Sequence, residues 1–188
     1  MMKRIEALKI IDRHVTDEIV VATYSSAHDW IAINHRPLNY YSFGAMGLAS
    51  SHALGMALAM PQRRVVVLDG DGSLLMNLGT LVTIAAAGPK NLVHFVCKND
   101  TYEANGGHPI VNQSVDFVGI AKAAGISAVH SISDLTQLER QIADVLKAEG
   151  PVFCVLNVEQ GAIVPREYED MYSSRRRQAL RMALTESA

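Results

Sequence analysis

Cysteine is scarce in this sequence, and its placement argues against several kinds of site. The 188 residues contain two cysteines, Cys97 and Cys154, which lie far apart in separate apolar runs. We expect both to be small buried side chains that form neither a disulfide nor a metal-binding pair. Because no CxxC spacing occurs, the sequence also argues against a cysteine-ligated cluster.

Excess charge of one sign and long apolar runs are also missing. The formal net charge of −2 argues against a general nucleic-acid binder, and the basic cluster 175–177 is predicted to be a solvated helix face. No segment reaches the about 18 uncharged apolar residues that cross a bilayer. Residues 1–15 lack the continuous apolar stretch of a signal peptide. We therefore expect a soluble, cytoplasmic protein that binds neither nucleic acid nor membrane.

The sequence does have a regular alternation of apolar strands and helices. The predicted strands cover residues 18–24, 63–69, 91–99, 126–130 and 151–159. The predicted helices cover residues 5–15, 46–60, 73–88, 115–125 and 133–149, the last with Ser133 as its N-cap. This order predicts an α/β fold, a parallel sheet covered by helices on both faces. We expect one domain over 1–188, with 165–188 a charged C-terminal helix or tail.

Polar residues follow three of the predicted strands. They are Ser25-Ser26, the Asp-Gly-Asp-Gly-Ser segment 69–73, and the stretch from Asn99 to His108. Ligands of such folds bind beyond the carboxyl ends of the strands, so these segments predict a site at one edge of the sheet. Polar turns would also be found there in a protein without a site.

The segment 69–73 and Asn99 offer the ligands for a metal ion and a phosphate. Its glycines allow backbone amides to approach an anion, and Ser73 can donate a hydroxyl hydrogen bond. A carboxylate at Asp71 beside a phosphate requires a cation between them, and Mg²⁺ accepts such oxygen ligands, including the amide of Asn99. The alternative is purely structural, with Asp71 capping a helix and Asn99 forming an Asx-turn.

These residues resemble the cofactor motif of the thiamine diphosphate enzymes. That motif begins with Gly-Asp-Gly, here Gly70, Asp71 and Gly72 followed by Ser73, and ends with an asparagine, here Asn99. The family usually has two asparagines at this point, and Lys98 replaces the first. The resemblance implies that Asp71, Asn99 and the carbonyl of Thr101 bind Mg²⁺, and that the Gly70–Ser73 segment binds the diphosphate of the cofactor.

The resemblance extends over essentially the whole chain. By its match to the segment SFGAMGLASSHALGMALA, the carbonyl of Gly44 accepts a hydrogen bond from the cofactor's aminopyrimidine. Met46 is the apolar wedge that bends the cofactor, and Ser25 and Ser26 lie where the family binds the diphosphate. The loop NDTYEANGGHPI is similar to that of the phosphonopyruvate and sulfopyruvate decarboxylases, which tends to read ESTGGQPT.

The resemblance implies a subunit of a decarboxylase, a lyase that acts on a small 2-oxo acid with thiamine diphosphate and Mg²⁺. Glu103 and His108 are then candidate catalytic residues on a loop over the thiazolium ring, with His108 a candidate proton donor. His108 stands where the resembled enzymes tend to have glutamine, which puts a sulfonate or phosphonate substrate in doubt.

The resemblance also implies a second subunit. The family needs an activating glutamate from a pyrimidine-binding domain, and 188 residues do not hold both domains. We therefore expect a heteromer, with residues 46–60 and 100–112 as contact surfaces.

Three alternative functions stay open: a carboligase of the acetolactate synthase type, a 2-oxo acid:ferredoxin oxidoreductase subunit, which the absence of cluster cysteines disfavours, and a non-catalytic cofactor-binding subunit. A nicotinamide-binding protein is disfavoured because no GxGxxG turn follows the first strand.

Overall fold

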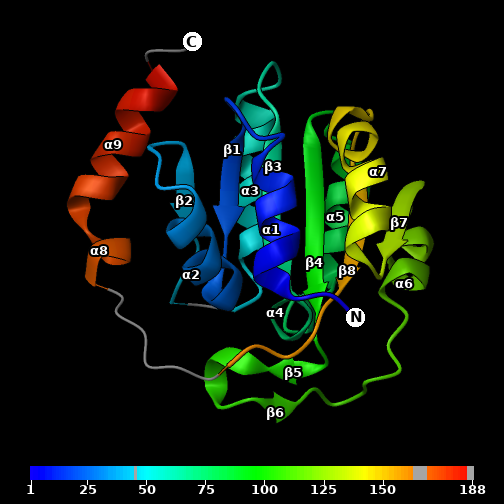
Figure 1. The fold of residues 1–188 in the computed structure, drawn as a ribbon. Coiled ribbons are helices and arrows are strands. Elements are labelled where there is room, and N and C mark those ends of the chain that lie inside the picture. Colours follow the sequence, from blue (N-terminus) through cyan, green and yellow to red (C-terminus); the bar gives the residue numbers. More distant parts are fainter. Residues whose placement is uncertain (45, 163–168, 186–188) are drawn as a thin grey trace.

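The computed structural model describes residues 1–44, 46–162 and 169–185, and its centre is a six-stranded sheet (Figure 1). Neighbouring strands of this sheet are all parallel, in the order β2-β1-β3-β4-β8-β7. The strands are β1 (Ile19–Ala22), β2 (Asn39–Tyr41), β3 (Val65–Gly70), β4 (Leu92–Lys98), β7 (Ala128–Ile132) and β8 (Val152–Asn157). The predicted α/β fold with a parallel sheet is thus confirmed.

Helices cover both faces of this sheet. One face is covered by α1 (Arg4–Asp12), α2 (Tyr24–Ile33) and α7 (Leu135–Lys147), and the other by α3 (Ala49–Ala59), α5 (Gly79–Ala87) and α6 (Phe117–Ala123). The short helix α4 (Asp71–Leu75) follows β3 directly. At the carboxyl edge of the sheet lies a small hairpin of β5 (Thr101–Tyr102) and β6 (His108–Pro109), joined by the 3-10 turn η1 (Glu103–Asn105) (Figure 1).

The central strands are buried on both faces, which explains their continuous apolar sequences. In β3, Val66 and Leu68 pack in the cluster beneath α1, α2 and α7, while Val65 and Val67 pack in the cluster beneath α3 and α5. All four side chains are fully buried. Such a sheet has no solvent-facing side, so its functional groups lie beyond the ends of its strands.

Three elements in the first part of the chain differ from the prediction. Residues 25 and 26, expected at a strand end, form the first turn of α2, whose first residue Tyr24 has a φ of 45°. The short edge strand β2 was not predicted. The helix expected over 46–60 begins only at Ala49, because Gly47 has a φ of 88°, outside the right-handed helical region.

The helix expected over 73–88 is two helices, α4 and α5. Between them, Asn77 donates its side-chain amide to the carbonyl of Gly47 at 3.1 Å, and Gly79, a poor helix former, starts α5. The predicted stop at Gly88 is confirmed, with a left-handed φ of 57°.

The second half of the chain differs in smaller ways. The strand expected at 126–130 is β7, two residues further on. The N-cap of α7 is Asp134 and not Ser133, because the carboxylate of Asp134 accepts from the backbone N–H of Gln137 at 2.8 Å. The predicted loop NDTYEANGGHPI, residues 99–110, contains the hairpin β5–β6.

The described part of the charged C-terminal segment forms two helices. They are α8 (Glu169–Tyr172) and α9 (Ser174–Thr185), and α9 lies beside the edge strand β2 (Figure 1). The rest of the predicted tail, 165–168 and 186–188, lies outside the described residues.

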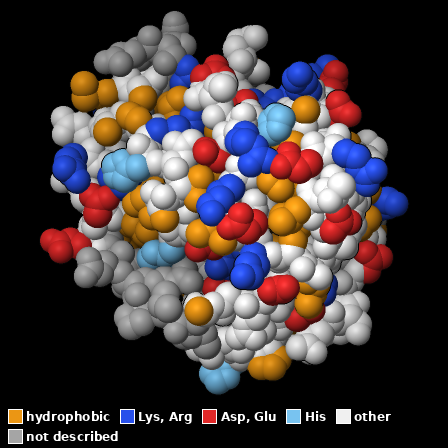
Figure 2. Space-filling view, viewed as in Figure 1, with side chains coloured by type: hydrophobic (Ala, Val, Ile, Leu, Met, Phe, Trp, Pro, Cys, Tyr) orange, Lys and Arg blue, Asp and Glu red, His pale blue; other side chains and the backbone are white. Residues whose placement is uncertain are grey.

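The remaining expectations from composition concern the cysteines, the surface and the membrane. Cys97 and Cys154 are both buried and free, as predicted. Figure 2 shows acidic and basic side chains interspersed on the face that carries α1 and α7. Within the described ranges, no helix combines the length and the apolar character needed to cross a bilayer.

Candidate cofactor site

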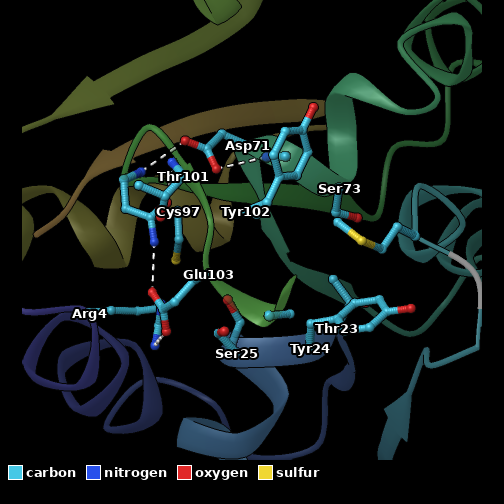
Figure 3. Close-up of a pocket in the computed structure, with 16 residues that line it drawn as sticks. Arg4, Thr23, Tyr24, Ser25, Asp71, Ser73, Cys97, Thr101, Tyr102 and Glu103 are labelled. Atoms are coloured by element: carbon cyan, nitrogen blue, oxygen red, sulfur yellow. Dashed lines mark hydrogen bonds and ion pairs between the residues drawn. The ribbon is translucent and has the colours of Figure 1, made fainter. Parts of the chain in front are cut away.

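A cavity lies at the carboxyl ends of β1, β3 and β4, where the sequence predicts a site (Figure 3). Of the predicted site residues, those that line it are Ser25, Ser26, Met46, Gly70, Asp71, Gly72, Ser73, Asn99, Thr101 and Glu103. Strand pairing explains the convergence. Residue 70 at the end of β3 is opposite residue 97 in β4, so the segments that follow both strands start side by side.

Asp71 is the first residue of α4 and is almost fully buried. One carboxylate oxygen accepts from the backbone N–H of Gly72 at 2.7 Å, and the other accepts from the backbone N–H groups of Asn99 and Asp100 at 2.9 and 2.7 Å. Burial raises the pKa of Asp71 to about 6, although these hydrogen bonds oppose the shift. A cation beside this carboxylate would remove much of the cost of its burial.

The other aspartate of the motif, Asp69, has a different environment. It is completely buried within β3, and its carboxylate lies 3.2 Å from Nε2 of His94 on the neighbouring strand. Asp69 therefore contacts the interior of the sheet, whereas Asp71 faces the cavity.

Asn99 follows β4 and forms an Asx-turn. Its side-chain oxygen accepts from the backbone N–H and the hydroxyl of Thr101 at 3.0 and 3.1 Å, and its amide nitrogen donates to Glu103 at 2.7 Å. The purely structural alternative, an Asx-turn at Asn99 and a helix cap at Asp71, is therefore only partly observed. Asn99 makes the turn, but Asp71 does not cap a helix, since the N-cap of α4 is Gly70.

The donor set suits Mg²⁺ together with a phosphate ligand. Asp71 supplies a carboxylate, Asn99 an amide oxygen and Thr101 a carbonyl, all from adjacent segments. Over the ranges that the structure describes, no group of three or more histidine, cysteine or acidic side chains is placed to hold a metal ion. A metal at this site would take its remaining ligands from a phosphate or water, which is the usual environment of Mg²⁺.

Ser73, Ser25 and Ser26 surround the cavity with hydroxyl groups. The hydroxyl oxygen of Ser73 accepts from the backbone N–H of Gly47 at 3.1 Å, so its own hydrogen is available to an anion. Ser25 and Ser26 are buried in the first turn of α2. The dipole of α4 adds little to anion binding here, because that helix has only five residues.

Gly44 and Met46 precede α3, on either side of a residue that the structure does not describe. Gly44 has a φ of 94° and is exposed, outside the residues that line the cavity. Met46 does line it, and its sulfur lies 3.7 Å from the side-chain amide of Asn105 on the hairpin. An apolar side chain is therefore present at the rim, at the position expected for the wedge.

Glu103 is held by a buried arginine that the sequence analysis missed. Arg4 donates from both terminal nitrogens to the two Glu103 oxygens at 2.7 and 2.9 Å, and from Nε to Asp29 at 2.7 Å. Burial acts to raise the pKa of Glu103, but Arg4 holds it below its usual range. Burial also acts to lower the pKa of Arg4, and its acidic partners raise it above the ordinary value. Figure 3 shows Glu103 directed toward Arg4.

His108 lies on β6 with its side chain exposed, outside the residues that line the cavity. It is opposite Tyr102 in the hairpin. The structure therefore brings Glu103 to the predicted site and leaves His108 at the surface of the hairpin.

Two tyrosines are further cavity residues that the sequence analysis did not assign to the site. The ring of Tyr102 covers Gly72 so closely that a Cβ on that glycine would lie 2.5 Å from its Cδ1. Tyr24 lines the cavity with a backbone φ of 45°, which is rare for a bulky residue and concentrates at functional sites. No pattern of spacing predicts either feature, because both depend on how the strand ends meet.

Comparison with known proteins agrees with this geometry. Residues 21–156 match the model of the family described as thiamine pyrophosphate enzyme, C-terminal TPP binding domain. The chain belongs to this family. The matched region contains the segments after β1, β3 and β4 that line the cavity, so the predicted resemblance is confirmed.

Two curated relatives are similar over most of the chain. The sulfopyruvate decarboxylase subunit beta of Methanothermobacter thermautotrophicus is 38% identical over 162 residues, which cover 86% of this chain and 84% of that subunit. The phosphonopyruvate decarboxylase of Streptomyces viridochromogenes is 39% identical over 145 residues, which cover 77% of this chain. The matched region spans only 36% of that longer protein.

Solved structures show the same fold. The benzoylformate decarboxylase of Polynucleobacter necessarius superposes with a TM-score of 0.69 at 21% identity, over 82% of this chain and 33% of that one. A protein of very different sequence thus shares this arrangement of sheet and helices.

Proposed function

We propose that the chain is the metal- and diphosphate-binding subunit of a thiamine diphosphate-dependent decarboxylase of the sulfopyruvate or phosphonopyruvate type. The observation that carries this proposal is the convergence of Asp71, Asn99 and Thr101 at the ends of two adjacent strands. Similarity to a sulfopyruvate decarboxylase β subunit over 84% of that subunit's length supports it.

In this proposal each cavity residue has a defined task. Asp71, the side-chain oxygen of Asn99 and the carbonyl of Thr101 bind Mg²⁺, which neutralises the diphosphate. The backbone N–H groups of Asp71 and Ser73 and the hydroxyls of Ser25, Ser26 and Ser73 donate to phosphate oxygens. The N–H groups of Gly70 and Gly72 already donate to the carboxylates of Asp69 and Asp71. When bound, thiamine diphosphate supplies the electron sink that decarboxylation of a 2-oxo acid requires.

The rim residues orient the other end of the cofactor. Met46 supports the bend between the two rings, and the carbonyl of Gly44 accepts from the aminopyrimidine. The exposed position of His108 means that a role in proton donation depends on substrate or a partner subunit reaching the outer side of the hairpin.

A second subunit with a pyrimidine-binding domain completes the site and carries the activating glutamate. Both predicted contact surfaces expose large apolar side chains. Leu58 on α3 is 54% exposed, and Val111 in the 100–112 loop is 86% exposed. On α5, which packs against α3, Val82 is 59% exposed. Burying such side chains against a partner would favour association.

The test is decarboxylation of sulfopyruvate, phosphonopyruvate and pyruvate by the full chain with thiamine diphosphate and Mg²⁺, alone and with a candidate pyrimidine-binding subunit. We expect turnover to an aldehyde only in the complex. Robust activity of the chain alone would contradict the two-subunit site, and acetolactate or acetoin as the product would indicate a carboligase.

Asp71→Ala separates a catalytic subunit from a non-catalytic one. A catalytic subunit loses both Mg²⁺-dependent cofactor binding and turnover of the complex. If turnover persists while cofactor binding to this chain is lost, the chain is a non-catalytic subunit.

A further inference from the structure

Asn99 has an amide side chain, and only one of its two ends can bind a cation. The oxygen is a ligand for Mg²⁺, whereas the NH₂ group is a donor that repels it. A binding site that uses Asn99 therefore needs a contact that fixes which end faces the metal. A free amide would rotate between the two orientations and lose affinity.

That contact is present in the hairpin. The carboxylate of Glu103 accepts from Nδ2 of Asn99 at 2.7 Å, and a carboxylate accepts but does not donate. The amide nitrogen is thereby committed to Glu103. The oxygen is left on the side of Thr101, the other predicted metal ligand, where it accepts from the threonine N–H and hydroxyl.

Glu103 is itself fixed from a distant part of the chain. Arg4 binds both of its oxygens, and the backbone N–H of Gly161 donates to Oε2 at 3.2 Å. The side chains of Arg4 and Glu103 are 6% and 3% exposed, so the pair is shielded from water. Pairing of Met2 with the chain that follows β8 holds Arg4 beside residue 161.

We propose that Glu103 and Arg4 are positioning residues for the metal ligand Asn99. Arg4 holds the Glu103 carboxylate, and Glu103 turns the Asn99 oxygen toward the metal. This assignment rests on the proposed function, because it presumes a metal at Asp71 and Asn99. It replaces a direct catalytic role for Glu103, whose two oxygens are already engaged.

The test is calorimetric titration of the full chain with Mg²⁺ at saturating thiamine diphosphate, comparing two variants that each remove one acidic partner of Arg4. Glu103→Met removes the acceptor that also touches Asn99, and Asp29→Leu removes the one that does not. We expect Glu103→Met to weaken Mg²⁺ binding about 10- to 100-fold, as is typical when the support of a metal ligand is lost. Asp29→Leu should change it less than about threefold.

A second variant keeps the test decisive if Glu103→Met does not fold. A carboxylate is ordinarily a good Mg²⁺ ligand, yet Asn99→Asp would place it against Glu103, and the two charges would repel. We expect Asn99→Asp to weaken Mg²⁺ binding, and the added Glu103→Gln change to recover part of the loss.

The outcomes separate the two proposals. If the wild-type chain shows no Mg²⁺-dependent binding of thiamine diphosphate, the proposed function fails and this inference fails with it. If the wild type binds, the positioning role alone is overturned by equal losses in Glu103→Met and Asp29→Leu, by unchanged binding in Glu103→Met, or by undiminished binding in Asn99→Asp.

Discussion

The segments that follow β3 and β4 meet at the same edge of the sheet, but different contacts hold them. After β3, the chain enters α4 at once, and the carboxylates of Asp69 and Asp71 each accept from the next residue's backbone N–H. After β4, the chain forms the hairpin β5–β6, where Glu103 is bound by Arg4 and Gly161. These partners are 99 and 58 residues away in the sequence.

The two segments that form the proposed metal site are therefore stabilised in different ways. The residues of the segment after β3 stand together in the sequence, so they are recognisable there, although Asp71 also accepts from Asn99 and Asp100, 28 and 29 residues away. The hairpin after β4 depends on α1 and the chain beyond β8 being in place. We therefore expect the hairpin to be sensitive to substitutions far from the site, and the β3 segment to be sensitive mainly to its own residues and to the hairpin that it contacts.

Removing Arg4 should have the largest effect. Arg4→Met leaves the buried carboxylate of Glu103 without its cation, so we expect a loss of about 3–5 kcal/mol in the free energy of unfolding by urea. The matched control is Arg13→Met at the C-cap of the same helix, which breaks an exposed pair with Glu139 and should cost at most about 1 kcal/mol. Similar losses in both variants would show that the hairpin does not depend on Arg4.

Asp71 should give the metal-free chain a pH dependence. Burial raises its pKa from the ordinary 3.8 to about 6, so the folded state binds its proton more tightly than the unfolded state does. The resulting stability is present below about pH 4 and is lost as the pH rises through about 6, a change of about 3 kcal/mol.

The measurement is urea unfolding of the metal-free wild type and Asp71→Asn between about pH 4 and pH 7. As the pH rises over this range, the free energy of unfolding of the wild type should fall by this amount relative to that of Asp71→Asn. A difference that does not change with pH would mean that the carboxylate is better solvated than its burial indicates.

Two glycines of the same motif should respond differently, with the smallest effects. A Cβ at Gly72 would overlap the Tyr102 ring, whereas one at Gly70 would meet nothing within 4 Å, at an allowed φ of −118°. Gly72→Ala should therefore destabilise the metal-free chain by about 1–3 kcal/mol, and Gly70→Ala by at most about 0.5 kcal/mol. Equal costs in thermal unfolding would mean that the Tyr102 contact does not couple the two segments.

Much of the architecture was predictable because it depends on local patterns. Buried parallel strands are continuously apolar, and the residues of the β3 turn stand together in the sequence. The start of α2 at Tyr24 was not predictable, since its positive φ is rare for tyrosine. The break between α4 and α5 depends on the distant contact of Asn77 with Gly47.

Arg4 shows what sequence reasoning overlooked within the site. It lies four residues before Leu8 and seven before Ile11, so it shares the buried face of α1 with them. A cation on an apolar helix face signals a buried acidic partner. The identity of that partner, Glu103, could not be read from spacing, because the fold alone brings them together.

The most direct test of the whole account is a crystal structure of the full chain with Mg²⁺ and thiamine diphosphate. We expect one Mg²⁺ with a carboxylate oxygen of Asp71, the side-chain oxygen of Asn99 and the carbonyl of Thr101 at about 2.1 Å. Glu103 should still bind Arg4 and the Asn99 amide. A metal held by other residues, or a cofactor bound away from the ends of β3 and β4, would contradict the account.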